Sequence, residues 1–129
     1  MTIPFLCVLA AWLLIYIPKF AVSAAIARAG GYDNHHPRDQ QATLSGWKKR
    51  GTAAHTNAFE NFAPFAAAVL IAHLGHANES LSAALALVFV GARVLHPVLY
   101  IADLATLRSL VWGIGFSSTG LLFVAPLFR

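Results

Sequence analysis

Four long apolar runs, separated by polar segments, divide the chain. They cover about residues 3–27, 52–73, 81–102 and 108–128, and each gives roughly 30 Å of helix, which is enough to cross a membrane. The runs are rich in alanine and leucine and do not alternate with a period of two, so they predict helices rather than strands. At 129 residues the chain is long enough for one domain, residues 1–129. The last connection, residues 103–107, is so short that the third and fourth helices must lie antiparallel, and we expect an antiparallel bundle of four transmembrane helices.

The composition agrees with this pattern. Hydrophobic residues make up 58% of the 129-residue chain and charged residues only 11%, whereas soluble domains carry roughly a quarter charged residues. The excess apolar surface must therefore face lipid or partner subunits. The first run lacks a basic leader and a convincing cleavage site, so we expect a retained span rather than a signal peptide. The sequence predicts an all-α integral membrane protein.

The distribution of charge predicts an orientation. The net charge is +4, and the polar segment 28–51 holds most of the basic residues: Arg28, Arg38, Lys48, Lys49 and Arg50. Because basic loops stay in the cytoplasm, we expect this segment and the connection 103–107 on that side and both termini outside. Such a loop indicates contact with membrane lipid rather than with nucleic acid. His35 and His36 lie in it without a cluster of acidic or thiol residues at ligand spacing, so we predict no metal site.

Two polar stripes interrupt the middle runs. They consist of Asn57, Glu60 and Pro64 on the second run, and of Arg93, His96 and Tyr100 on the third. Each set is spaced i, i+3, i+7, which places it on one face of a helix. Glu60 lies roughly 12 Å from the cytoplasmic start of its helix and Arg93 roughly 14 Å from the cytoplasmic end of its own. We therefore predict an intramembrane ion pair between them.

The stripes favour a ligand site over a purely structural role. We expect them to form a polar track that opens to the cytoplasm, where Arg108 and Ser109 begin the last helix. The alternative is that these groups only hold the helices together. Polar contacts between membrane helices contribute well under about 1–2 kcal/mol each. Placing polar and charged side chains within a membrane is costly, so holding the helices together does not explain why this chain has so many of them. We predict a cationic, hydrogen-bonding pocket for an anionic ligand.

The chain resembles the MAPEG family, the membrane-associated proteins in eicosanoid and glutathione metabolism, over nearly its whole length. The resemblance rests on RGTAAHTNAFENFAPF (residues 50–65), RVLHPVLY (93–100) and RS (108–109), while DNHHPR in the first loop is similar to bacterial members. It implies a four-helix homotrimer in the bacterial inner membrane. It also implies a glutathione site in a cleft between subunits and transferase or peroxidase activity on lipophilic electrophiles.

The same resemblance assigns roles to single residues. The residues that would hold glutathione are Arg50, Asn57, Glu60, Arg93 and Tyr100. Arg108 matches the arginine that stabilises the glutathione thiolate, and Ser109 stands beside it. A cation near sulfur favours the reactive thiolate, so no nucleophile from the protein is required.

Ala53 departs from the family pattern, because glutathione-using members carry a basic residue just before the Ala-x-x-Asn core. Two functions therefore remain open. One is a glutathione-dependent enzyme, and the other is a non-catalytic member that binds a lipid or another anionic ligand in the same cleft. A small multidrug exporter is disfavoured. Such exporters centre on an unpaired glutamate in the first span, and the first span of this chain has no acidic residue.

Overall fold

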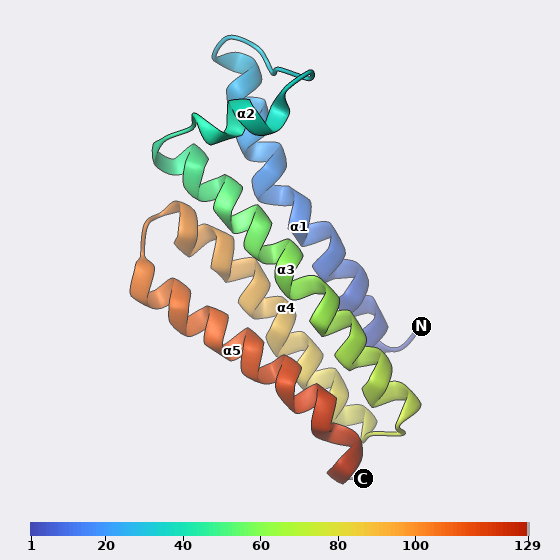
Figure 1. Ribbon diagram of the computed structural model, residues 1–129. Helices are drawn as coiled ribbons and strands as arrows, with labels where there is room; N and C mark the ends of the chain where they lie inside the picture. The colour runs from blue at the N-terminus through green and yellow to red at the C-terminus, as the bar shows by residue number, and fades with distance from the viewer. Residues whose placement is uncertain (129) are drawn as a thin grey trace.

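The computed structural model describes residues 1–128, which form helices joined by short connections (Figure 1). The elements are α1 (Ile3–Arg28), α2 (Pro37–Ala42), α3 (Gly46–Leu74), α4 (Glu79–Ile101), α5 (Ala105–Val124) and the 3-10 helix η1 (Ala125–Phe128). The described residues contain no strand. The prediction of an all-α chain is therefore confirmed.

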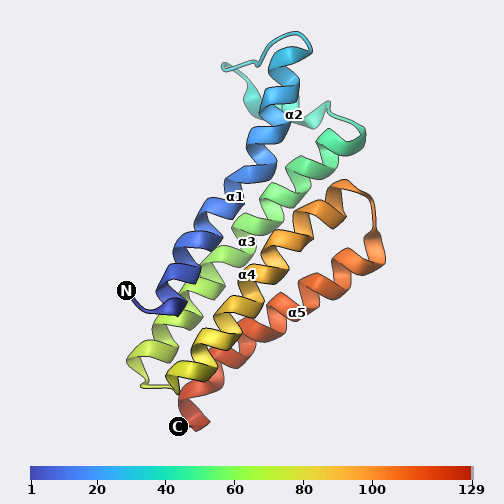
Figure 2. The same ribbon diagram turned by 180° about the vertical axis from the view of Figure 1, so that it is seen from behind.

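Four long helices, α1, α3, α4 and α5, run lengthwise beside one another (Figures 1 and 2). The most extensive contacts join α4 to α5 and α1 to α3, and α3 also packs against α4 and α5. The two ends of this arrangement differ. We call the end with α2 and the α4–α5 connection the loop end. The opposite end, with the start of α1 and the α3–α4 connection, is the terminal end.

Three helices are long and apolar enough to cross a membrane: α1, α4, and α5 together with η1. Only 28% of the most apolar stretch of each is buried, so most of their apolar surface faces outward, as lipid requires. The fourth long helix, α3, has 29 residues but is not among the three. Its first turns carry Lys48, Lys49 and Arg50, and its middle carries Asn57 and Glu60.

Helix boundaries differ from the predicted spans mainly at α3. This helix begins at Gly46 rather than near residue 52, and α2 forms within the segment predicted as a loop. Lysine and arginine are good helix formers, so the helix extends through Lys48, Lys49 and Arg50 even though the apolar run begins only after them. Before α2, the chain turns around Asp33, whose Oδ1 accepts from the backbone N–H groups of His35 and His36 at 2.9 and 3.0 Å.

Small residues let the helices approach closely. The core contains Ala11, Ala54, Ala68, Ala72 and Ala86, all almost fully buried. Between α3 and α4, the rings of Phe65 and Phe89 stack with their centres 3.7 Å apart. A Cβ atom on Gly51 would lie 2.6 Å from Cγ2 of Val22, so α1 and α3 meet at a position that only glycine fits. Such close approach is common between membrane helices.

Both short connections end the preceding helix in the same way. At the terminal end, the N–H of Ala77 donates to the carbonyl of Ala72 at 2.9 Å, and His76 has a left-handed φ of 54°. Asp103, with φ of 62°, occupies the same position at the loop end. This hydrogen bond and a left-handed residue define the Schellman motif, which usually places glycine there.

Candidate functional site

Arg93 lies at the centre of the site and is only 5% exposed. Its Nη1 donates to Oδ1 of Asn57 at 3.3 Å, which joins α4 to α3. Its guanidinium carbon lies 5.3 Å from the centre of the Phe89 ring, within the range of a cation–π contact. Its Nε and Nη2 have no hydrogen-bond partner among the described residues. This buried cation therefore keeps N–H donors available for an acceptor group.

Two further residues fix the geometry around Arg93. Nδ2 of Asn61 donates to the backbone oxygen of Asn57 at 2.8 Å and lies 3.4 Å from its Oδ1. On α5, a Cβ atom on Gly115 would lie 2.9 Å from Nη2 of Arg93. The absent side chain gives the guanidinium its space. Three helices, α3, α4 and α5, thus enclose one positive charge.

A path of aromatic and cationic side chains leads from Arg93 to the loop end. His96 is buried, and its ring packs edge-on against Tyr100 with the ring centres 5.6 Å apart. The guanidinium carbon of Arg108 lies 4.3 Å from the centre of the Tyr100 ring. Arg108 is half-buried and Ser109 is exposed next to it. The polar stripe of α4 therefore continues onto the start of α5.

Arg50 has partners within the chain. Its Nε donates to the backbone oxygen of Ile101 at 3.0 Å, and its Nη1 lies 3.9 Å from Oδ2 of Asp103. The last carbonyls of a helix lack partners within that helix, so this arginine of α3 satisfies one at the end of α4. The ion pair is solvent-exposed on the Asp103 side and contributes about 0–1 kcal/mol.

The predicted ion pair between Glu60 and Arg93 does not form within the chain. Glu60 is exposed and forms no ion pair with any described residue, while Arg93 contacts Asn57 instead. The reason is angular. Three residues turn an α-helix by about 300°, which leaves Glu60 about 60° away from Asn57 around the axis. Glu60 and Arg93 lie at similar depths along their helices, but their side chains do not face each other.

The interior beside Arg93 is small. A cavity of about 10 Å³ lies between α1, α3 and α4, walled by Arg93, His96, Phe62 and Pro97 among others. This is about the space that a single water molecule needs. A ligand of peptide size therefore does not fit inside one chain at this position.

The structure unites some of the predicted site residues and leaves others apart. Asn57 contacts Arg93, and Tyr100 contacts Arg108. Arg50 bonds instead to Ile101 at the end of α4, while the side chains of Glu60 and Ser109 are exposed. Three contributors were not predicted: Asn61, Phe89 and Gly115. Only Asn61 could have been found, because it follows Asn57 by four residues, a spacing at which helix side chains meet.

The model of the MAPEG family matches residues 3–128, which is nearly the whole chain and includes every helix described above. The chain belongs to the MAPEG family. Comparisons with curated proteins and with solved structures found no match. Membership of the MAPEG family supports an integral membrane protein with a role of the glutathione transferase or peroxidase type, or a related one.

Proposed function

We propose that this MAPEG protein is a glutathione-dependent transferase or peroxidase that acts on lipophilic electrophiles from within the membrane. The observation that carries the proposal is the path from Arg93 through Tyr100 to Arg108. Glutathione has two carboxylates and a thiol, so it needs cations at separate points. Arg93 would contribute a buried positive charge beside Asn57 that attracts a carboxylate, and Arg108 lies nearer the loop end for the sulfur. Arg50, Asn57 and Glu60 would bind its remaining polar groups.

We propose that the glutathione cleft lies between the subunits of a homotrimer. The cavity beside Arg93, about 10 Å³, is too small for the ligand, so the site needs a surface outside this chain. Glu60 supports the same assembly. It is exposed on a long helix of a membrane protein, and a carboxylate at that depth requires a polar partner. A neighbouring subunit, or glutathione bound between subunits, would cover it.

We also propose a four-helix, multi-pass topology in the bacterial inner membrane. In it α3 crosses the membrane with α1, α4 and α5, and segment 28–51 lies in the cytoplasm. The support is the charge of the loop end, which carries the basic residues Arg28, Arg38, Lys48, Lys49, Arg50 and Arg108. Basic residues next to a span hold that end on the cytoplasmic side.

In the proposed reaction, Arg108 stabilises the thiolate of glutathione. A free thiol has a pKa near 8.5, and a cation close to sulfur favours loss of its proton to solvent. The thiolate then donates an electron pair to the electrophilic carbon, a C–S bond forms, and the leaving group departs with its bonding pair. The side chain of Arg108 has no hydrogen bond to any described residue and rests on the Tyr100 ring. Its N–H groups are free to turn to sulfur, and Ser109 adds a hydroxyl beside them.

A second candidate function is a non-catalytic protein that binds a lipid or another anionic ligand in the same cleft. Two observations favour it. The free N–H groups of Arg93 suit any carboxylate or phosphate. Position 53, one helical turn before Asn57, is alanine, whereas glutathione-using members carry a basic residue there.

The test is equilibrium binding of glutathione to the purified protein, together with turnover of a model electrophile. Glu60→Gln is expected to weaken binding by about tenfold, which is about 1.4 kcal/mol. Arg108→Ala is expected to lower the turnover number about a hundredfold while binding changes little, because a cation at the sulfur acts mainly in the reaction. Arg28→Ala, which removes an exposed arginine at the end of α1, is the matched control and should behave as the wild type.

Two results would contradict parts of this proposal. Equal turnover by Arg108→Ala and Arg28→Ala would refute the role given to Arg108. Absence of glutathione binding at millimolar concentration, with a lipid retained in native mass spectrometry, would favour the non-catalytic function.

A further inference from the structure

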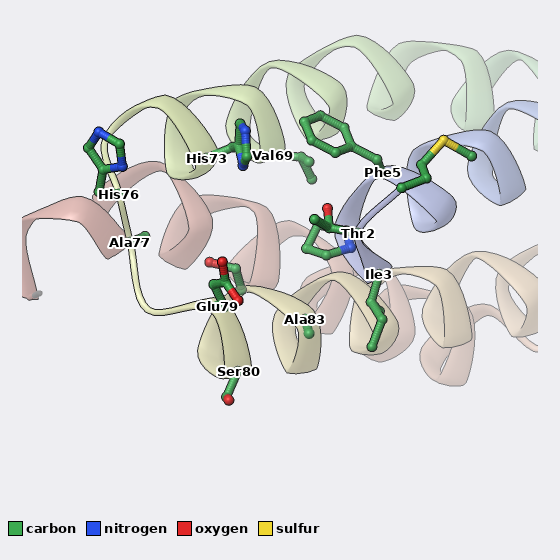
Figure 3. A pocket seen from close by; sticks show the side chains of 13 residues that line it. Thr2, Ile3, Phe5, Val69, His73, His76, Ala77, Glu79, Ser80 and Ala83 are labelled. Carbon is green, nitrogen blue, oxygen red and sulfur yellow. The ribbon is translucent and has the colours of Figure 1, made fainter.

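A cavity lined by both apolar and polar side chains lies at the terminal end, far from Arg93. Its volume is about 580 Å³, within the range of roughly 300–1,000 Å³ that small-molecule sites occupy. Three elements enclose it: the start of α1, the last turns of α3 and the first turns of α4 (Figure 3). Ala83, in its wall, precedes Arg93 by ten residues, or about 15 Å along α4. The cavity is thus separate from the proposed glutathione site.

One side of the cavity is apolar. Ile3 and Phe5 of α1, Val69 of α3 and Ala83 of α4 contribute to it. The ring of Phe5 packs edge-on against that of His73, with centres 5.0 Å apart, so α1 and α3 are in contact at this wall. A hydrocarbon chain is the ligand part that such a surface accepts, because removing apolar area from water is favourable.

The other side is polar and of mixed character. His73 and His76 come from the end of α3 and the connection after it, and Glu79 comes from the first turn of α4 (Figure 3). A neutral histidine both donates and accepts hydrogen bonds, whereas a carboxylate only accepts. The carboxylate would repel a phosphate or a second carboxylate. This lining therefore suits a ligand head that donates and accepts hydrogen bonds without carrying a net negative charge.

Ser82 gives independent evidence that the cavity is a site. It lines the cavity and is 7% exposed, and its hydroxyl has no hydrogen-bond partner among the described residues. A serine within a helix can bond to the carbonyl four residues earlier, but here the carbonyl of Asn78 accepts from the backbone N–H of Ser82 at 3.0 Å and not from its hydroxyl. A buried hydroxyl without a partner destabilises the protein, and a hydrogen bond from a ligand would remove that penalty.

We propose that the terminal end holds a binding site for a single-chain lipid with an uncharged, hydroxylated head, of the monoacylglycerol class. The hydroxyls of the head contact Ser82, His73 and Glu79. The acyl chain lies against Ile3 and Phe5 and continues toward the apolar surfaces of α1 and α4. The polar part of the cavity lies where these helices begin, which is the depth at which a lipid head sits. This site does not depend on glutathione or on the assembly proposed above.

The test uses 1-monolauroylglycerol, with the full-length protein in nanodiscs and empty nanodiscs as the background. Saturable binding is expected for the wild type. Ala83→Trp fills the cavity and is expected to weaken binding at least tenfold. Ala84→Trp places the same ring on the exposed side of α4 and is the matched control, with binding unchanged. Dodecyl phosphate and lauric acid, which share the chain but carry charged heads, are expected to bind at least tenfold more weakly.

Ser82→Ala provides a second variant that hardly changes the shape of the core. It is expected to weaken binding about fivefold, while Ser117→Ala, at an exposed position of α5, has no effect. If Ala83→Trp does not fold, the comparison of Ser82→Ala with Ser117→Ala tests the proposal instead. Equal binding by Ala83→Trp and Ala84→Trp, equal binding by the two serine variants, or preference for dodecyl phosphate would overturn the proposal.

Discussion

Gly115 controls how the only buried arginine among the described residues is held. Because a Cβ atom there would lie 2.9 Å from Nη2 of Arg93 and 3.4 Å from Cβ of Ala92, even alanine must displace the guanidinium. Moving the guanidinium would disturb its bond to Asn57, which is already long at 3.3 Å. A methyl group added at Gly115 of α5 would thus affect the contact between α4 and α3.

We therefore predict that Gly115→Ala lowers stability by about 1–3 kcal/mol, the usual cost of overpacking. Gly113→Ala is the matched control. No atom lies within 4 Å of a Cβ at Gly113, so alanine there should be neutral or stabilise the helix by about 0.5–1 kcal/mol. Thermal unfolding in detergent measures both.

A double variant tests the mechanism. In an Arg93→Ala background the clash is absent, so Gly115→Ala should no longer destabilise the protein. An equal loss of stability in both backgrounds would show that Gly115 acts on something other than Arg93.

At the residue scale, the sequence predicted which polar groups share a level but not which of them touch. Arg93, His96 and Tyr100 were placed correctly on one face of α4, because their spacing alone fixes that relation. The pairing of Arg93 depended on how far α3 is rotated about its axis. Packing against α1 and α4 sets that rotation, and no local pattern encodes it.

At the scale of elements, the α3–α4 connection was largely predictable. Gly75 ends α3 and Asn78 begins α4, with its Oδ1 accepting from the N–H of Leu81 at 3.0 Å. Glycine and asparagine often stand at helix ends, so these two residue types predict a break between the helices. The left-handed position, however, belongs to His76 and not to the neighbouring glycine. Which residue of a tight turn takes a positive φ depends on the exact end of the helix, which sequence patterns leave open by a residue or two.

This assignment leads to a prediction about stability. His76→Gly should raise the midpoint of thermal unfolding, because a left-handed backbone costs a residue with a Cβ roughly 1–2 kcal/mol more than glycine. Asp103→Gly should gain less, because it also removes the carboxylate that lies 3.9 Å from Arg50. A loss of stability in His76→Gly would indicate that the imidazole makes a stabilising contact that outweighs the relief of the backbone.

At the scale of the whole molecule, the outer surface is that of a membrane protein. Large apolar side chains are exposed on α1 and α5, among them Leu13, Ile17, Phe20, Leu110, Ile114 and Phe116. Composition and run length were enough to predict this, because they do not depend on pairing. The quaternary arrangement is different, since it depends on surfaces that meet only between chains.

Labelling of introduced cysteines tests the predicted orientation. Cys7 is the only native cysteine and is 4% exposed, so its background should be low. In inverted inner-membrane vesicles, whose cytoplasmic face is outermost, an impermeant maleimide should label Asn34→Cys in the first loop. Ser80→Cys at the start of α4 should be labelled only after the vesicles are opened. The reverse pattern would place segment 28–51 outside the cytoplasm.

The double contact of Arg50 has a mechanical consequence. By bonding the last carbonyl of α4 and approaching Asp103, it ties the beginning of α3 to the turn that leads into α5. At the loop end, one side chain therefore links the start of α3, the end of α4 and the turn before α5. The side chain of Arg108, at the start of α5, contacts the aromatic ring of Tyr100. The Arg108 side chain can therefore turn away from the Tyr100 ring while the contacts of Arg50 keep the backbone at this end in place.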